Sequence, residues 1–233
     1  MENYQELQKR LIEKATRFHE LSLPVIEAFY HYPRHEFVPS RYSAAEAYTD
    51  TALPLFKQGR AHSTISQPSF VLYLLELLKL EKNQKVFEVG TGSAWNAALI
   101  SDLVGDQGLV VTMEIIPDVA KQAKENISKH NIKNVKVIEG DASFGFEAEA
   151  PYDRIIFTAA ATKMPDFVSQ QCRDGGRVLY VQEGEAGTDE VLVLEKRQNT
   201  FKCLQRIPCF FVAMTGSASD GSNKPPSERR RIL

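Results

Sequence analysis

Three short segments of this chain combine glycine with a carboxylate in a way that suits the binding of a small polar ligand. The segment Glu88-Val89-Gly90-Thr91-Gly92 follows an apolar run, and its glycines allow a sharp turn and a close approach to a ligand. Glu114 ends a second apolar run, 22 residues beyond Gly92, and Gly140-Asp141-Ala142 ends a third. A carboxylate placed like Glu114 can accept hydrogen bonds from both ribose hydroxyls, and Asp141 can accept from an adenine amino group. Either acid alone would ordinarily be a solvated strand-end residue, but the three segments in this order indicate one nucleoside site.

Two classes of ligand compete for the glycine segment. A dinucleotide-binding turn has the pattern G-x-G-x-x-G/A, which lets a pyrophosphate reach the following helix. Here Trp95 occupies the third position after Gly92 and obstructs that close packing. An E/D-x-G-x-G turn is typical of class I methyltransferases, in which this end of the ligand is an amino acid. We therefore predict that Glu88, Gly90, Thr91 and Gly92 bind S-adenosylmethionine (AdoMet).

Alternating strand and helix patterns bring these segments to one edge of a sheet. Strands are expected at 85–89, 109–114, 135–139, 154–159 and 177–181, with helices at 96–104, 117–130 and 165–172 between them. Residues 191–196 and 201–212 have the pattern of a closing antiparallel pair. The predicted fold class is therefore α/β, a doubly wound, mostly parallel seven-stranded sheet of the Rossmann-like class I methyltransferase type. In such a sheet the ligand binds beyond the carboxyl ends of the strands.

The rest of the chain divides into a cap, a core and a tail. Residues 1–66 predict an N-terminal helical cap followed by a loop-rich substrate segment, with Pro24 opening a second helix and Pro33 closing it. Residues 67–216 form the AdoMet-binding core, which begins with a helix at 69–80, so that residues 1–216 are one methyltransferase domain. Residues 217–233 are rich in Pro, Gly and Ser without apolar periodicity, and we expect a disordered tail.

Composition limits the possible partners and the cellular location. A net charge of −2 provides no basic field for nucleic acid, and the charged start has no signal-peptide core. The longest apolar stretch is shorter than the ~20 residues of a membrane helix. Three widely spaced cysteines indicate free thiols in a reducing cytoplasm. His31 and His35 have metal-ligand spacing but lack a third ligand in sequence, so we predict no metal. We expect a cytoplasmic monomer that binds neither nucleic acid nor membrane.

Longer motifs make the chain resemble the protein-L-isoaspartate (D-aspartate) O-methyltransferase family from about residue 7 to residue 216. The discriminating motif is TISQP at Thr64–Pro68, because general methyltransferases lack it. The other matching motifs are PRHEFVP at 33–39, AYTDTALP at 47–54, EVGTGS at 88–93, MEIIPDVAKQAKENI at 113–127, EGDAS at 139–143, EAPYDRIIFTAAA at 149–161 and GGRVL at 175–179.

The resemblance implies an activity and a set of site residues. The activity is methyl transfer from AdoMet to the side-chain carboxylate of L-isoaspartyl residues in damaged proteins and peptides. The resulting ester closes to a succinimide that reopens partly to normal aspartate, which makes the reaction a repair. Ser66 is implied as the active-site hydroxyl that orients the acceptor, with Thr64 beside it. The implied cofactor-binding residues are Gln67, Ser69, Glu88, Gly90, Thr91, Gly92, Glu114, Ile115, Asp141 and Ala142.

This assignment agrees with the chemistry of a carboxylate acceptor. A carboxyl with a pKa near ~4 is ionised at neutral pH, so orientation and exclusion of water matter more than a general base. Ser66 could also cap the helix that begins at Pro68, either in place of this role or in addition to it. Two other functions stay open: methylation of another carboxylate, such as an aspartate in a maturing peptide, and non-catalytic AdoMet binding.

The segment LFKQGRAHS at 55–63 directly precedes Thr64. Its Gln58-Gly59 pair predicts a turn, and it lacks apolar residues after Phe56 except for Ala61. We expect a mobile lid over the bound peptide, with a solvated surface insertion as the alternative. The resemblance places this segment, residues 180–184 and residues 211–214 near the backbone of the substrate.

Overall fold

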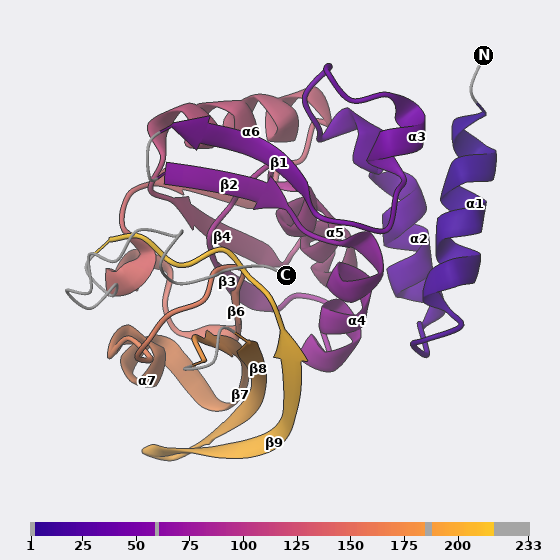
Figure 1. The fold of residues 1–233 in the computed structure, drawn as a ribbon. Coiled ribbons are helices and arrows are strands. Elements are labelled where there is room, and N and C mark those ends of the chain that lie inside the picture. Colours follow the sequence, from indigo (N-terminus) through magenta and orange to yellow (C-terminus); the bar gives the residue numbers. More distant parts are fainter. Residues whose placement is uncertain (1–2, 59–60, 185–187, 217–233) are drawn as a thin grey trace.

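A central seven-stranded sheet organises the chain, and the computed structural model describes it over residues 3–58, 61–184 and 188–216 (Figure 1). The strand order is β5-β4-β3-β6-β7-β8-β9. The first five strands in this order are parallel, and β8 and β9 add an antiparallel ribbon. The strand bounds are β3 Lys85–Val89, β4 Leu109–Glu114, β5 Val135–Glu139, β6 Tyr152–Phe157, β7 Cys172–Gln182, β8 Asp189–Arg197 and β9 Thr200–Cys209. The predicted fold class is confirmed, and the predicted tail at 217–233 lies outside the described residues.

Helices cover this sheet and build a cap beside it. The core helices α5 Trp95–Val104 and α6 Pro117–Lys129 pack on β3, β4 and β5, whereas α4 Pro68–Leu78 and α7 Phe167–Gln171 contact β7. The cap consists of α1 Tyr4–Ala15, α2 Leu23–His31, the 3-10 turn η1 Arg34–Glu36 and α3 Ala44–Ala47. In Figure 1 the cap helices lie along one side of the core, where α1 and α2 pack on α4 and α2 also packs on α5. Two further 3-10 turns, η2 Ala142–Phe144 and η3 Glu147–Glu149, connect β5 to β6.

Polar contacts at both ends of α4 fix the direction of this helix. Near its N-terminus the Asp50 carboxylate accepts from the Ser69 N–H at 3.0 Å. At its C-terminus Arg177 donates to the Leu77 carbonyl at 2.8 Å, and Arg154 donates to the carbonyls of Leu78 and Lys79, each at 2.9 Å. Cationic groups at the carboxyl end of a helix stabilise its last carbonyls. The described part of the chain contains no helix with the length and apolar character needed to cross a bilayer.

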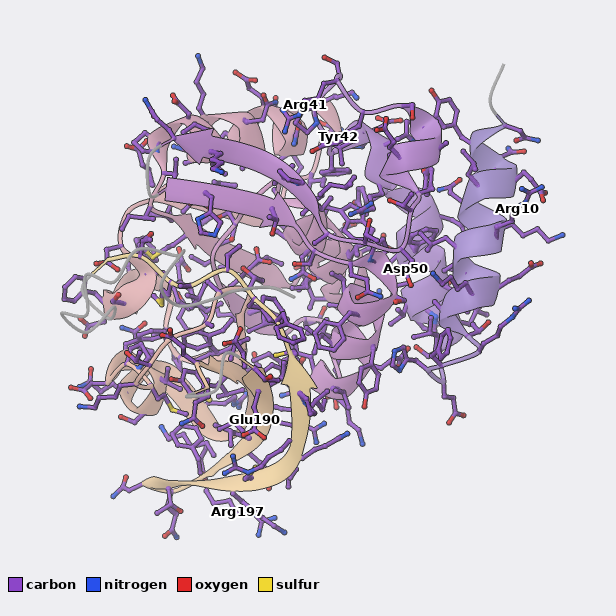
Figure 2. All side chains as sticks on the ribbon, viewed as in Figure 1. Arg10, Arg41, Tyr42, Asp50, Glu190 and Arg197 are labelled. Carbon is purple, nitrogen blue, oxygen red and sulfur yellow. The ribbon has the colours of Figure 1, made fainter. Side chains whose placement is uncertain are left out.

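The segment before Thr64 is a β-hairpin, so the prediction that this stretch is rich in loops was wrong here, whereas its role as a mobile lid over the bound peptide stays a prediction. Strands β1 Leu53–Gln58 and β2 Ala61–Ile65 pair antiparallel, with Leu53 opposite Ile65 and Gln58 opposite Ala61. Two residues outside the hairpin, Arg41 and Tyr42 (labelled in Figure 2), each donate a side-chain hydrogen bond to the Pro54 carbonyl. The local pattern did not reveal β1 because Pro54 and the polar Lys57-Gln58 interrupt the apolar alternation typical of a strand. Residue 59 of the predicted turn lies outside the described residues.

Candidate active site

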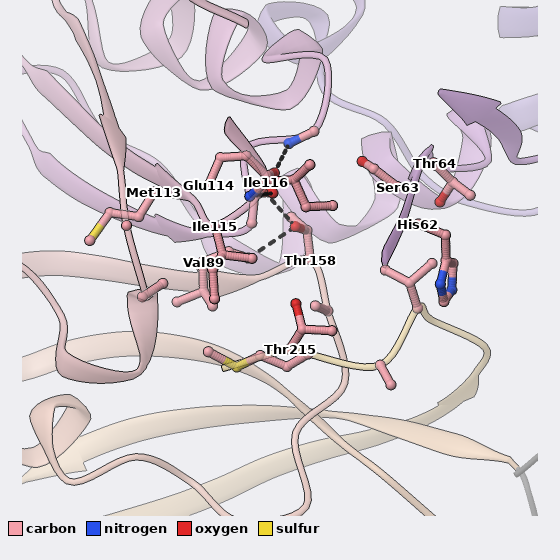
Figure 3. A pocket seen from close by; sticks show the side chains of 18 residues that line it. His62, Ser63, Thr64, Val89, Met113, Glu114, Ile115, Ile116, Thr158 and Thr215 are labelled. Atoms are coloured by element: carbon pink, nitrogen blue, oxygen red, sulfur yellow. Dashed lines mark hydrogen bonds between the residues drawn. The ribbon is translucent and has the colours of Figure 1, made fainter. Parts of the chain in front are cut away.

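A cavity of about 560 Å³ lies at the carboxyl ends of the parallel strands. In Figure 3, His62, Ser63 and Thr64 of the hairpin lie on one side of it, facing Glu114, Ile115 and Ile116 at the end of β4. The remaining wall residues are Val89, Gly90, Gly92, Met113, Gly140, Ala142, Thr158, Ala159, Val212, Ala213, Met214 and Thr215.

A second cavity of about 500 Å³ adjoins the first. The two share Thr64, Gly90, Gly92 and Thr158, so they meet at the glycine segment. The second cavity reaches Ser66 at the start of α4, Glu88 inside the sheet, and the apolar side chains Ile65, Val71, Leu74, Trp95, Ile156 and Phe211. One side of the glycine segment therefore faces Glu114, and the other faces Ser66.

The glycine segment is held against the end of β6. Gly90 has a φ of 92°, and a Cβ at this position would lie 2.6 Å from the Thr158 hydroxyl oxygen. That hydroxyl donates to the carbonyls of Val89 and Gly90, at 2.9 and 2.6 Å. Only glycine fits here without displacing Thr158, because both the backbone angle and the space exclude a side chain.

Glu88 is fully buried behind the glycine segment. Its carboxylate accepts from Thr112 Oγ1 at 2.6 Å and from Asn96 Nδ2 at 2.7 Å. Thr91 Oγ1 lies 2.7 Å from Thr112 Oγ1 and extends this network to the loop. Burial raises the pKa of the Glu88 carboxyl to about 7, although its hydrogen bonds oppose the shift. Glu88 therefore supports the segment and lines the second cavity.

Glu114 supports the glycine segment and also lines the first cavity. Its carboxylate accepts from the Gly92 N–H at 2.9 Å and from the Ile116 N–H at 3.1 Å. Burial raises the pKa of this carboxyl, while the backbone donors lower it. Each carboxylate oxygen can accept more than one hydrogen bond, so Glu114 retains capacity toward the cavity that it lines.

The third predicted segment lies on the same wall. Gly140, Ala142 and Ile115 line the first cavity. The Asp141 carboxylate accepts from the Ser143 N–H at 2.9 Å, at the start of η2. Gly216 approaches Asp141 so closely that a Cβ on it would lie 2.7 Å from the carboxylate oxygens. Its contact with an adenine amino group stays a prediction.

Ser66 and Thr64, the residues predicted to meet the methyl acceptor, both line the second cavity. No hydrogen bond of the Ser66 hydroxyl is found within the described part of the chain. The N-cap residue of α4 is Gln67, and the Ser69 N–H is satisfied by Asp50. The alternative that Ser66 caps this helix is therefore wrong. Its hydroxyl is available to a ligand.

The side chains of Gln67 and Ser69 bind Asp50. Gln67 Nε2 and Ser69 Oγ donate to the Asp50 carboxylate at 3.2 and 3.0 Å. Neither residue is among the described residues that line the two cavities. In this structure they hold the substrate segment in place, and direct contact with the cofactor stays a prediction.

Two groups of residues that line the first cavity were not predicted from the sequence to contact a ligand. Thr158 and Ala159 follow β6, so the strand-end rule that identified Glu114 could have identified them. Val212–Thr215 reach the site by pairing beside Ala160, whose N–H donates to the Val212 carbonyl at 2.8 Å. The resemblance suggested that residues 211–214 lie near the substrate, but no local pattern indicates this pairing.

These residues fit a nucleoside with an amino-acid end. A carboxylate at the end of β4, a glycine segment in which Gly90 has no room for a side chain, and a second cavity that adjoins the first define a class I AdoMet-dependent methyltransferase.

Comparison with known proteins identifies the family. The model of the family described as protein-L-isoaspartate(D-aspartate) O-methyltransferase matches residues 4–219. Protein-L-isoaspartate O-methyltransferase of Pyrococcus abyssi is 41% identical over 196 residues, 84% of this chain and 88% of its own. That of Methanopyrus kandleri is 36% identical over 227 residues, 96% and 97% of the two chains. A solved protein-L-isoaspartate O-methyltransferase superposes with a TM-score of 0.81 at 28% identity, covering 93% of this chain and 67% of the other.

The chain belongs to the protein-L-isoaspartate(D-aspartate) O-methyltransferase family. It is an enzyme that methylates isoaspartyl residues, and its methyl donor is AdoMet.

Replacement of Glu114 by alanine should weaken binding of S-adenosylhomocysteine. A hydrogen bond to a charged group contributes roughly 1.5–3 kcal/mol, so the dissociation constant should rise about 10–100-fold. Calorimetry would measure it, with Glu139→Ala on the adjacent strand as the exposed control. Unchanged affinity in a Glu114→Ala protein with the parental circular dichroism spectrum would contradict the assignment.

The raised pKa of Glu88 makes the stability of the ligand-free protein depend on pH. Between the ordinary value of 4.5 and about 7, folded Glu88 keeps a proton that the unfolded chain has released. The free energy of unfolding should therefore decrease as the pH rises through this window. The side chain of Glu88→Gln cannot ionise, so this variant should lose the part of the pH dependence that comes from Glu88.

Urea unfolding at about pH 5 and about pH 7.5 measures the free energy of unfolding of the parent and of Glu88→Gln, with Glu139→Gln as the control. Equal slopes in parent and Glu88→Gln would show that Glu88 ionises as freely as in water.

Proposed function

We propose that methyl transfer takes place where the two cavities meet, with Glu114 on the donor side and Ser66 on the acceptor side. One observation carries this proposal: Thr64, Gly90, Gly92 and Thr158 line both cavities. A donor seated on the glycine segment in the first cavity would then have its reactive end beside the second. The chemistry that AdoMet supplies when bound is an electrophilic methyl group on a sulfonium.

On the donor side, the chain offers hydrogen-bond acceptors and close backbone. Glu114 is proposed to accept from the ribose hydroxyls, and Gly90, Thr91 and Gly92 to border the amino-acid end. The adenine ring would lie between Ile115 and Ala142, both of which line the first cavity. Asp141 is proposed to accept from the adenine amino group.

On the acceptor side, the Ser66 hydroxyl is proposed to donate to the isoaspartyl carboxylate and hold one oxygen toward the methyl donor. This carboxylate is ionised at neutral pH, so a neutral hydroxyl orients it without the loss of nucleophilicity that an ion pair would cause. The apolar walls of the second cavity support exclusion of water. The backbone amide nitrogen that follows can then attack the ester carbonyl carbon, and the C–OCH₃ bond breaks with release of methanol as the succinimide closes; a methoxy group leaves more readily than the oxygen of an ionised carboxylate.

We also propose that the enzyme acts as a monomer in the cytoplasm. Cys172, Cys203 and Cys209 are free thiols in the structure, which suits a reducing compartment. Sedimentation at micromolar concentration would test the oligomeric state.

The protein should methylate an isoaspartyl peptide and leave the matched aspartyl peptide at background. The extra backbone methylene of isoaspartate changes where its carboxylate lies relative to Ser66. Transfer of a labelled methyl group, read as base-labile ester, measures both peptides, with Glu114→Ala as the donor-site control. Equal labelling of the aspartyl peptide would favour the alternative acceptor, and labelling of neither would favour a non-catalytic module.

Ser66→Ala should lower turnover on the isoaspartyl peptide by about 10–100-fold, because it removes one hydrogen bond to a charged acceptor. Affinity for S-adenosylhomocysteine should change by less than about twofold, because Ser66 lines the second cavity and not the first. Ser169→Ala, on α7, is the matched control. Parental turnover in Ser66→Ala would remove Ser66 from the reaction.

A further inference from the structure

Arg34 is a fully buried charged side chain that lies between the cap and the segment carrying Ser66. Its guanidinium is directed at backbone carbonyls from two separate stretches of chain. They are those of Ala47, of Thr51 at 2.9 Å and of Ser66 at 3.1 Å, with longer contacts of 3.5 Å to Thr49 and Ile65. One side chain therefore ties residues 47–51 to residues 65–66.

A buried guanidinium loses its hydration, so this arrangement stabilises a core poorly. Burial lowers the pKa of Arg34 to about 10, so the group is still charged at neutral pH. Within the described residues no carboxylate forms a salt bridge with it, and its Nε lacks a hydrogen-bond partner. A buried charge without direct neutralisation stabilises a fold less than an apolar side chain of similar volume. The contacts of Arg34 therefore need a reason beyond stability.

Asp50 holds the other end of the same segment. Its carboxylate accepts from the N–H and hydroxyl of Ser69, each at 3.0 Å, and from Gln67 Nε2 at 3.2 Å. Lys14 of α1 lies 3.4 Å from it, and Figure 2 places Asp50 beside the cap helices. Arg34 thus binds the carbonyls of residues 65 and 66 while Asp50 binds the donors of residues 67 and 69. The Ser66 hydroxyl, between them, is the group left for a ligand.

Arg34 also lies close to the helix that follows the glycine segment. Its guanidinium carbon lies 5.8 Å from the ring centroid of Trp95, the first residue of α5 after the glycine segment. The Trp95 indole N–H donates to the Tyr32 carbonyl at 2.9 Å, which ties α5 to the cap. The guanidinium therefore lies between the segment that carries Ser66 and the first residue of α5.

We propose that Arg34 and Asp50 are positioning residues for methyl transfer, which act through the backbone of residues 65–69 to aim the Ser66 hydroxyl at the acceptor carboxylate. The inference rests on the proposed function of Ser66. In-line transfer is sensitive to geometry, and a displacement of ~1 Å can reduce turnover by about 100-fold. Neither residue needs to touch the substrate.

A double-mutant cycle with the full-length protein tests this role. Arg34→Lys keeps the charge but loses the forked donor, and it should lower kcat on the isoaspartyl peptide by about 10–100-fold. Affinity for S-adenosylhomocysteine should change by less than about threefold. If Arg34 acts through Ser66, the same change in a Ser66→Ala background should have little further effect. Arg154→Lys is the matched control, since Arg154 also binds backbone carbonyls of α4 but at its other end, and should leave kcat unchanged.

Amide hydrogen exchange of residues 64–69 supplies a readout that needs no substrate. Exchange should be faster in Arg34→Lys than in the parent, both saturated with S-adenosylhomocysteine, and unchanged in Arg154→Lys. If Arg34→Lys does not fold, Asp50→Asn enters the same cycle and the same exchange measurement. Parental kcat, equal losses with and without Ser66, or unchanged exchange would overturn the proposal. A parent without activity on isoaspartyl peptide would instead refute the proposed function, and the exchange result would still decide whether Arg34 holds the segment.

Discussion

The backbone hydrogen bonds between parallel strands continue one residue beyond the ends of β3, β5 and β6. These additional bonds fix the positions of the groups that follow the strands on the donor side of the site. The Gly90 N–H donates to the Met113 carbonyl at 3.0 Å, Gly140 to Glu114 at 2.9 Å, and Thr158 to Val89 at 3.0 Å. Since all of these strands run in the same direction, their following residues emerge together at one edge. The turn, the carboxylate and the Thr158 hydroxyl are therefore fixed relative to one another by backbone, which suits a reaction that needs exact alignment.

The antiparallel end of the sheet completes the site from far along the chain. Strand β9 is separated from β6 by β7 and β8 but runs in the same direction as β6, so the chain leaves β9 at the same edge of the sheet at which β6 ends. The buried Asp189 accepts from the Phe211 N–H at 2.8 Å, and Met214 N–H donates to the Ala160 carbonyl at 2.7 Å. These contacts turn residues 211–215 into a wall of both cavities. The second cavity thus includes Phe211, which lies about 145 residues beyond Ser66 in the chain, and the first cavity includes residues 212–215.

Buried charges concentrate around the site in spite of their energetic penalty. Glu88 and Glu114 lie behind and beside the glycine segment, and Arg34 lies behind the Ser66 segment. Among the described residues none of the three forms a direct salt bridge, although Asp50 favours the charge of Arg34 from a distance. Each makes several hydrogen bonds instead, by which Glu114 and Arg34 fix neighbouring backbone and Glu88 fixes the side chains of Thr112 and Asn96. A fold optimised for stability alone would replace them by apolar groups. Their presence here is consistent with a site that requires orientation of its loops more than maximal stability.

The amino-acid sequence by itself determined the sheet and the donor half of the site. Strands at 85–89, 109–114 and 135–139 occur as predicted, because apolar periodicity and turn residues act over a few neighbouring positions. The rule that ligands bind at strand ends then located Glu114 and the glycine segment. Only the tertiary structure decided the hairpin at 53–65, the capture of Gln67 and Ser69 by Asp50, and the return of residues 212–215 to the cavity. These features depend on partners that are distant in the chain or on strand pairing that local composition disfavours, and local periodicity carries no information about such partners.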